Sequence, residues 1–154
     1  MTMGFRKKMD KALGRTLVLI MAVMVVNVLW QVFSRYVLGE PSSFTDELAR
    51  FLMIWVGVLG AAYVAGRNGH VAIDVLVRRA SGNNQKRLKQ MVRIAIVLFC
   101  LFAMVIGGLR LVYVTYVLEQ YSPALGMPLA VVYLVIPLSG LLIIYYKISD
   151  MLTN

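Results

Sequence analysis

The sequence predicts an all-α integral membrane protein with four transmembrane helices. Three observations carry this prediction: 60% of the 154 residues are hydrophobic, only 15% are charged, and the charges cluster between long apolar runs. A soluble domain of this size seldom has so few charged residues. We therefore expect one four-helix membrane domain over residues 1–154, with a short amphipathic helix in the connection between the second and third spans.

The first span is predicted over residues 16–37. The segment before it is basic, and no charged residue occurs between Thr16 and Phe33. This apolar run is longer than the core of a usual signal peptide, and no small-x-small cleavage site follows it. Trp30 and Tyr36 suit the interface between membrane and water. We expect an uncleaved helix that crosses the membrane.

The second span is predicted over residues 44–66 and opens on a charged turn. Ser43 is expected to cap its N-terminus, with Asp46 as the capping-box partner. No charged residue occurs between Phe51 and Gly66. That apolar run, together with the charged turn before it, is about long enough to cross a bilayer.

Two features inside this second span suggest packing against protein. Trp55 lies well within the span, away from either interface, where a tryptophan in contact with lipid is unusual. Gly57, Gly60 and Ala61 form a strip of small residues that allows another backbone to approach closely. Either a partner chain or a helix of this chain can supply that backbone.

The connection between the second and third spans is strongly basic. His70, Asp74 and Arg78 follow one another at intervals of four residues, so they form one polar stripe on an otherwise apolar segment. This pattern is typical of a helix that lies in the membrane interface. We predict such a helix over residues 71–80.

The third and fourth spans are predicted over residues 86–117 and 129–148. The third is apolar without interruption from Ile94 to Leu109. The fourth contains Pro137, which removes a backbone hydrogen bond and should kink the helix. Its end carries three residues expected to anchor it at the interface, namely Tyr145, Tyr146 and Lys147.

The distribution of charge predicts the orientation and excludes a nucleic-acid partner. The net charge is +9, but most basic residues lie in the segments 1–15 and 67–93, which flank apolar spans. Basic connections stay in the cytoplasm, whereas the other two connections are close to neutral. We expect both termini in the cytoplasm, and membrane lipids rather than nucleic acid around the chain.

Residues for catalysis or for solute transport are missing. One histidine and one cysteine, Cys100, cannot form the usual metal or bis-histidine haem sites, and no glycine-rich phosphate loop precedes a helix. The centres of the spans hold no Asp, Glu, Lys or Arg, which ion and proton pathways normally require. We predict no catalytic residues, no metal and no cofactor, and a thiol that is buried and inert. Asn27 and Gln31 are expected to hydrogen-bond between helices.

Four charged residues are expected at the outer membrane face: Arg35, Asp46, Glu47 and Arg50. They can pair internally, Asp46 with Arg50 four residues on and Arg35 with Glu47. They can also dock another protein, for which Arg35 is the best candidate because its helix ends there. The sequence leaves both alternatives open.

Several segments together resemble the small permease subunit of tripartite ATP-independent periplasmic (TRAP) transporters, the DctQ-like family. They are Arg35-Tyr-Val, Phe44-Thr-Asp-Glu-Leu-Ala-Arg50, Trp55 with Gly60-Ala61, Gly69-His-Val-Ala-Ile-Asp74, and the spacing Pro128, Tyr133, Pro137. The similarity covers nearly the whole chain. The resemblance implies a non-catalytic subunit of the bacterial inner membrane that scaffolds a much larger permease.

The resemblance further implies that the larger permease carries the substrate and sodium sites and moves as an elevator. A periplasmic binding protein delivers an organic acid such as sialic acid or a C4-dicarboxylate. Trp55 and the strip Gly57, Gly60 and Ala61 then become candidates for packing on the permease. Two other classes are alternatives. A self-sufficient homo-oligomeric transporter would need an acidic group at mid-membrane, which the spans do not contain, and a membrane anchor of a respiratory enzyme would need haem-binding histidines, whereas the chain has one histidine.

Overall fold

Four long helical segments make up the protein. The structure is a computed structural model of the chain and describes residues 2–39, 42–67 and 83–153. Its elements are α1 (Thr2–Phe33), η1 (Ser34–Leu38), α2 (Ser43–Gly66), α4 (Asn83–Phe99), η2 (Cys100–Ile106), α5 (Gly107–Val117), α6 (Leu129–Tyr133) and α7 (Val135–Thr153). Four helical stretches are long and apolar enough to cross a membrane, as the sequence predicted: Arg6–Leu38, Ser43–Gly66, Arg87–Val117 and Leu129–Met151.

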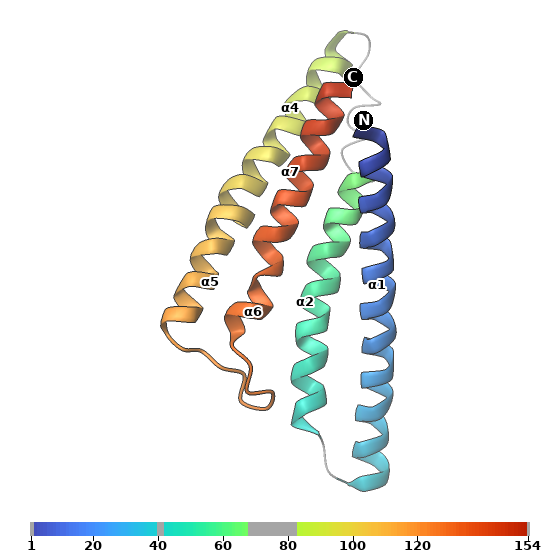
Figure 1. Cartoon of the computed structure of the whole chain (residues 1–154), viewed down its shortest axis with the longest axis vertical. Coiled ribbons are helices and arrows are strands. Elements are labelled where there is room, and N and C mark those ends of the chain that lie inside the picture. Colours follow the sequence, from blue (N-terminus) through green and yellow to red (C-terminus); the bar gives the residue numbers. More distant parts are fainter. Residues whose placement is uncertain (1, 40–41, 68–82, 154) are drawn as a thin grey trace.

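The four spans stand side by side in a row rather than in a closed bundle. Helix α1 packs on α2, α2 packs on α7, and α7 packs on α4 and η2, so the spatial order is first, second, fourth, third (Figure 1). In the fourth span 44% of the residues in its most apolar window are buried, against 11% to 17% in the other three. The fourth span is therefore the centre of the row.

Both chain termini lie at one end of the row, which we call the terminal end. The turn after Leu38 and the connection from Leu118 to Pro128 lie at the opposite end, which we call the loop end (Figure 1). Gly39 stops η1 with a φ of 73°, a left-handed conformation that glycine adopts without strain at a helix C-terminus. An isolated bridge between Tyr121 and Pro128 closes the longer connection into a narrow loop.

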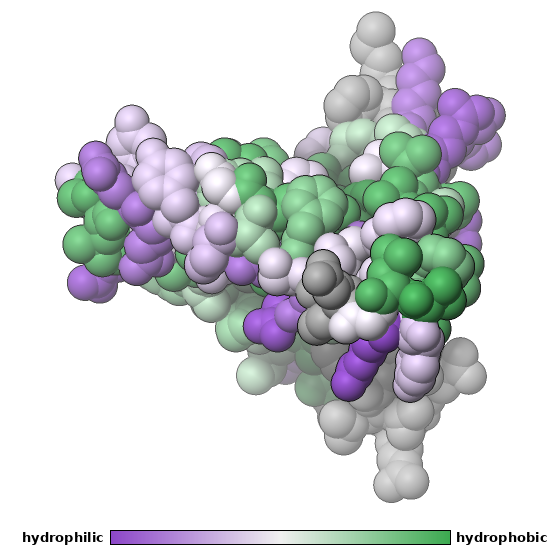
Figure 2. All heavy atoms as spheres, turned by 90° about the horizontal axis from the view of Figure 1, so that it is seen from below, coloured by the Kyte–Doolittle hydropathy of each residue, from purple (hydrophilic) through white to green (hydrophobic). Residues whose placement is uncertain are grey.

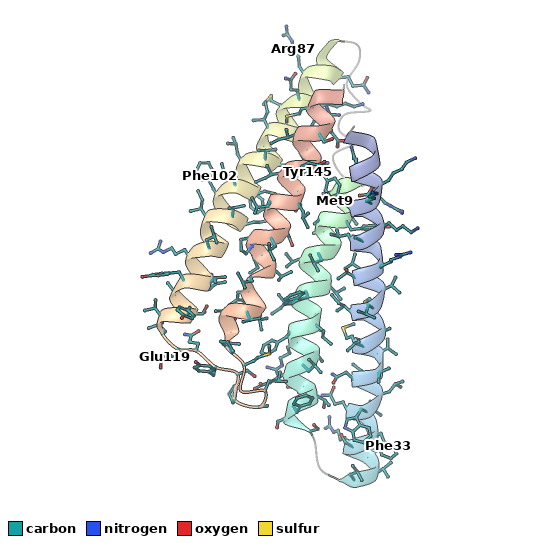
Figure 3. All side chains as sticks on the ribbon, in the orientation of Figure 1. Met9, Phe33, Arg87, Phe102, Glu119 and Tyr145 are labelled. Atoms are coloured by element: carbon teal, nitrogen blue, oxygen red, sulfur yellow. The ribbon has the colours of Figure 1, made fainter. Side chains whose placement is uncertain are left out.

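The hydrophobic core is small and lies between α2, η2 and α7. Ala62, Ala65, Cys100 and Ile143 form it, and the burial of Cys100 confirms the prediction for the single thiol. Elsewhere large apolar side chains point outward. Phe102, for example, is 62% exposed and points away from α7 (Figure 3). Such surfaces suit contact with lipid or with another membrane protein.

Seen from the loop end, hydrophobic residues reach much of the visible surface, and hydrophilic residues gather in separate patches (Figure 2). The outline is not round, because one arm extends sideways from a broader body. A row of helices produces this elongated outline. The long flanks of the row are therefore the parts available to a membrane neighbour.

Two irregularities shape the central contact. The fourth span leaves α-helical geometry at Leu134, one turn before Pro137, because the proline has no amide hydrogen for the carbonyl of Tyr133. The interruption lies one turn before the proline at which a kink was predicted. The second irregularity is the π-helical stretch η2 in the middle of the third span, which no pattern in the sequence had indicated. It packs against the fourth span at Gly140, where a Cβ atom would lie 2.8 Å from the Cβ of Met104.

The start of α2 differs from the prediction. The N-cap residue is Ser42 rather than Ser43, and its side chain makes no capping hydrogen bond. Thr45 instead donates its hydroxyl to the Ser42 carbonyl at 2.8 Å. Asp46 is therefore not a capping-box partner and remains available for the pair described below. The predicted interfacial helix over 71–80 lies outside the described residues.

Candidate functional site

Glu47 fastens the loop-end connection to α2. Its carboxylate accepts hydrogen bonds from the Ser122 hydroxyl and from the Ala124 amide, the latter at 3.1 Å. The Ser122 hydroxyl in turn accepts the amide of Leu125 at 3.2 Å. One carboxylate thus satisfies two donors of a loop that is distant in sequence. The predicted pair between Arg35 and Glu47 is wrong, because the loop occupies the Glu47 carboxylate.

The remaining charges at the loop end are accessible. Asp46 and Arg50 form the predicted pair, with 2.7 Å between Oδ2 and Nη2, and 71% of the Arg50 side chain is exposed. Arg35 lies in η1, is exposed, and makes no ion pair with any residue that the structure describes. An exposed pair of this kind contributes about 0.2–1 kcal/mol, so holding Asp46 and Arg50 together adds little to stability.

Asn27 and Gln31 join the first two helices, as predicted. The Asn27 amide donates to the Thr45 carbonyl at 2.7 Å, and this bond is buried. The Gln31 amide donates to an Asp46 carboxylate oxygen at 3.4 Å, a weaker contact. A polar group in an apolar layer needs such a partner because water is absent there. The two residues therefore hold the α1–α2 seam near the loop end.

Trp55 packs on protein within this chain. Its indole N–H donates to the Val132 carbonyl in α6 at 3.1 Å, and the side chain is half-buried. This confirms that Trp55 contacts protein rather than lipid alone. The small-residue strip of the same helix behaves differently. Among the described residues, a Cβ atom added at Gly57 or Gly60 would meet nothing within 4 Å, and Ala61 is exposed, so no helix that the structure describes fills the strip.

A polar network that the sequence analysis missed closes the terminal end. Arg6 donates to a carboxylate oxygen of Asp150 at 2.6 Å and to the Gly66 carbonyl at 2.6 Å. The Arg6 guanidinium also lies 5.6 Å from the centre of the Tyr146 ring. The Tyr146 hydroxyl donates to Asp10 at 2.7 Å. One arginine therefore connects α1, α2 and α7.

The same network extends to the third span and buries two charged residues. Arg93 of α4 donates to the backbone carbonyl of Asp150 at 3.1 Å, and Lys147 donates to the Ala65 carbonyl at 3.1 Å. Lys147 and Asp150 are only 4% and 5% exposed, and Tyr146 is fully buried. The expectation that Tyr146 and Lys147 anchor the helix at the interface is therefore wrong.

The sequence did contain a signal for this network. Asp150 is the only acidic residue after Glu119, and it stands among apolar residues at the end of the last span. A carboxylate in such a place needs a cationic partner. What the sequence did not show was that the partner is Arg6, which is 144 residues away.

The third group of predicted residues cannot be placed. His70, Asp74 and Arg78 lie outside the described residues. Within the ranges that the structure does describe, no three His, Cys, Asp or Glu side chains come close enough to hold a metal ion. Several polar groups contact one another or the backbone, Glu47 at the loop end and Arg6 at the terminal end. At the loop end this arrangement leaves Arg35, the exposed Asp46–Arg50 pair and the open strip on α2 accessible to partners.

Fold and contacts together define a multi-pass membrane protein whose ionisable groups lie at the two ends of its spans. The chain belongs to the family described as tripartite ATP-independent periplasmic transporters, DctQ component, which matches residues 8–154. It is a TRAP transporter small permease subunit rather than an enzyme, as its resemblance to this family implied.

Three relatives illustrate the match. A TRAP transporter small permease protein of Haemophilus influenzae is 28% identical over 94% of this chain and 88% of its own length. The ectoine TRAP transporter small permease protein TeaB of Halomonas elongata is 29% identical over 78% of this chain and 62% of its own length. The sialic acid TRAP transporter permease protein SiaT of Haemophilus influenzae is 29% identical over 70% of this chain but only 17% of its own length.

Proposed function

We propose that this chain is the fixed scaffold for the large permease of a sodium-coupled TRAP transporter that takes up an organic acid. The large permease holds the substrate and sodium sites and moves as an elevator, and a periplasmic binding protein delivers the substrate. The chain lies in the bacterial inner membrane with both termini in the cytoplasm, because its basic segments belong to the terminal end.

The observation that carries this proposal is the open row of helices. Its flanks expose large apolar side chains, and the centres of its spans contain no Asp, Glu, Lys or Arg. Moving a charged solute or ion through the membrane normally uses such groups, which are retained at mid-membrane only where they function. A broad apolar wall without them suits a support for a moving neighbour.

The relative SiaT supports the choice of neighbour. The segment similar to this chain makes up 17% of that protein, which is named a permease. A sequence like this one thus occurs within a longer permease polypeptide, where the two parts stay together by covalent linkage. The named solutes of SiaT and TeaB, sialic acid and ectoine, both carry a carboxylate, which supports an organic acid as substrate.

Each group of predicted residues has a place in this proposal. The strip Gly57, Gly60 and Ala61 packs on the large permease, because none of the described helices fills it. Trp55 holds α6 against α2 through its bond to Val132. Arg35 and the exposed Asp46–Arg50 pair face the binding protein, and Glu47 holds the neighbouring loop. His70, Asp74 and Arg78 form the polar stripe of the interfacial helix on the cytoplasmic side.

Deletion of this chain should abolish uptake by cells that retain the large permease and the binding protein. Labelled sialic acid and a labelled C4-dicarboxylate are the first substrates to test, each with an imposed sodium gradient and with potassium in place of sodium. Substrate binding by the isolated binding protein should be unchanged. Restoration by the intact chain is the control.

Two results would replace the scaffold proposal by the other classes. If the isolated chain in liposomes accumulates solute without a companion chain, it is a self-sufficient transporter. A haem absorption band in the purified protein would identify a respiratory anchor. Uptake that continues at the normal rate after deletion would show that the permease needs no scaffold.

Arg35→Glu should weaken docking of the binding protein at the loop end. Loss of one rim contact and its replacement by repulsion should raise the binding-protein concentration for half-maximal uptake about tenfold, because rim charges act mainly on association. The maximal rate should stay the same. Arg110→Glu is the matched charge reversal, since Arg110 is exposed on α5 at the opposite side of the row (Figure 1). Equal effects of both reversals would show general electrostatics instead of docking through Arg35.

A further inference from the structure

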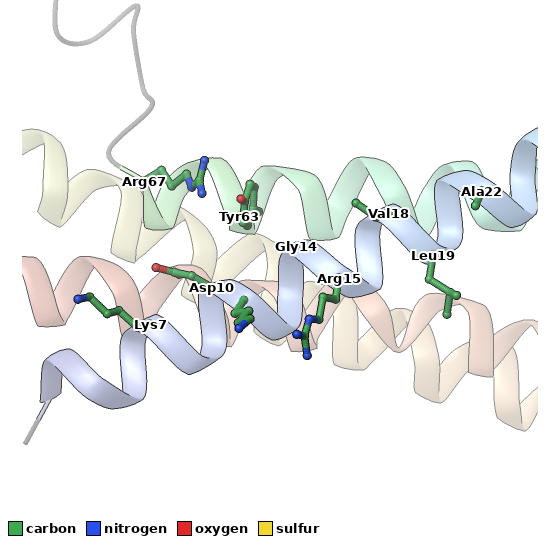
Figure 4. A pocket seen from close by; sticks show the side chains of 10 residues that line it. Lys7, Asp10, Gly14, Arg15, Val18, Leu19, Ala22, Tyr63 and Arg67 are labelled. Carbon is green, nitrogen blue, oxygen red and sulfur yellow. The ribbon is translucent and has the colours of Figure 1, made fainter.

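A groove runs between α1 and α2 at the terminal end. Its upper part, the part nearest the chain termini, is basic. It has a volume of about 750 Å³, and its lining residues are Lys7, Asp10, Lys11, Gly14, Arg15, Val18, Leu19, Ala22, Tyr63 and Arg67 (Figure 4). Lys7, Lys11 and Arg15 follow at intervals of four residues, so they stand on one face of α1. None of the three makes an ion pair with a described residue.

The opposite wall adds a fourth cation held in place by an aromatic ring. The Arg67 guanidinium lies 4.7 Å from the centre of the Tyr63 ring, a cation–π contact that limits its movement. Asp10 is the one acidic residue in the lining, and it already accepts the Tyr146 hydroxyl. Between the walls Gly14 leaves room, since an added Cβ would touch the Tyr63 ring at 3.4 Å. The upper groove therefore has an excess of positive charge.

Below the cations the groove becomes apolar and continues along the same seam. Val18, Leu19 and Ala22 line its lower part. Ala22 also lines a second hollow of about 530 Å³, together with Val23, Val26, Asn27, Trp30, Phe44, Thr45 and Leu48. From Arg15 to Val26 the helix rises roughly 16 Å, at 1.5 Å per residue. One leaflet of a bilayer has a hydrocarbon depth of about 15 Å.

We propose that this seam binds an anionic phospholipid. The phosphate of the headgroup lies among Lys7, Lys11, Arg15 and Arg67, and one acyl chain follows the apolar seam past Ala22. The sequence of cations, then apolar lining, over the depth of one leaflet matches the two parts of a phospholipid in their natural order. A free phosphate would use only the upper part, and a helix of another protein would leave four cations to be neutralised.

The test is native mass spectrometry of the full chain in mild detergent, titrated with dioleoyl phosphatidylglycerol or dioleoyl phosphatidylcholine. Each basic residue near an anionic lipid contributes enough attraction that the anionic lipid should bind about tenfold more tightly than the zwitterionic one. The variant Lys7→Gln/Lys11→Gln/Arg15→Gln should lose this preference. The variant Lys8→Gln/Arg87→Gln/Lys89→Gln removes the same charge from exposed positions outside the groove and should keep it.

A second pair of variants tests the apolar seam without changing charge. Ala22→Phe fills the point where the two hollows meet and should lower phosphatidylglycerol binding about tenfold, because the acyl chain loses its apolar contact. Ala12→Phe, at an exposed position of the same helix outside the lining, should bind like the unchanged chain. Far-ultraviolet and near-ultraviolet circular dichroism spectra that match between variants confirm that each remains folded.

Four outcomes would overturn the proposal. Equal binding of the two lipids would remove the headgroup selectivity. Equal losses in the groove and surface charge variants would reduce the effect to net charge. Displacement of the lipid by millimolar inorganic phosphate, with no effect of Ala22→Phe, would identify a free-anion site instead. If the seam is shielded from labelling reagents only when the large permease is bound, its occupant is that protein instead of a lipid.

Discussion

Replacing Arg6 with methionine should lower the free energy of unfolding by about 3 kcal/mol, because removing one partner of a buried ion pair leaves the other charge uncompensated. Arg6 contacts Asp150 at 2.6 Å, and the two side chains are only 23% and 6% exposed. The second carboxylate oxygen of Asp150 already lacks a described hydrogen-bond partner. After the substitution neither oxygen of the buried carboxylate would have a described hydrogen-bond partner.

Lys8→Met is the matched control for Arg6→Met. Lys8 is two residues further along the same helix, carries the same charge and is exposed. The measurement is unfolding of the purified chain in mixed micelles with increasing denaturing detergent. We expect the midpoint to fall for Arg6→Met and to stay within error for Lys8→Met. Equal midpoints for both variants would show that the terminal network contributes nothing.

A double substitution separates the ion pair from the packing around it. Arg6→Met/Asp150→Leu removes both charges and replaces them with apolar groups, so it should recover most of the stability lost in Arg6→Met. If the double variant is as unstable as the single one, the loss comes from the Gly66 and Tyr146 contacts of Arg6 instead. The comparison thus assigns the effect to specific atoms.

The spans were predictable because hydropathy alone determines them. Residues 94–109, for example, contain no charge, and no alternative to a membrane helix accommodates such a run. The interruption of the helix before Pro137 was predictable for an equally local reason, the missing amide hydrogen. The π-helical stretch η2 was not, because it depends on the fit of the third span against Gly140 of the fourth.

The contacts between spans were harder to predict because they depend on which helices are neighbours. A pair between Glu47 and Arg35, twelve positions earlier, was one of two alternatives, yet the partners of Glu47 are Ser122 and Ala124. Asn27 and Gln31 were predicted correctly since α1 and α2 are consecutive and joined by a short turn. The spatial order first, second, fourth, third brings Asp150 to Arg6, and no local pattern encodes that order.

The glycines also differ in whether their surroundings could be predicted from the sequence. The sequence singled out Gly57 and Gly60, but the tightest approaches within the chain occur elsewhere. A Cβ at Gly66 would lie 2.9 Å from the Tyr146 ring, and one at Gly140 would lie 2.8 Å from the Met104 Cβ. The strip on α2 is spacious by comparison. Substitutions at Gly140 therefore test packing within the chain, and substitutions at Gly57 test contact with a partner.

Gly140→Val should destabilise the isolated chain by about 3 kcal/mol, because an inserted side chain in a packed contact forces the helices apart. Besides the Met104 Cβ, the Val105 methyl lies 3.1 Å and the Cys100 carbonyl oxygen 3.4 Å from the new Cβ. Main-chain and Cβ atoms cannot move aside as the end of a flexible side chain can. Unfolding in mixed micelles should show an earlier midpoint, and an unchanged midpoint would mean that η2 and α7 separate without cost.

Gly57→Val is the matched control for stability and also tests the proposed permease contact. Nothing lies within 4 Å of the new Cβ, and valine is a better helix former than glycine, so the isolated chain should be at least as stable as before. If the strip packs on the large permease, the same substitution should reduce co-purification of that permease, because the backbones can no longer approach closely. A stable Gly57→Val chain that still retains its permease would place the contact on another flank of the row.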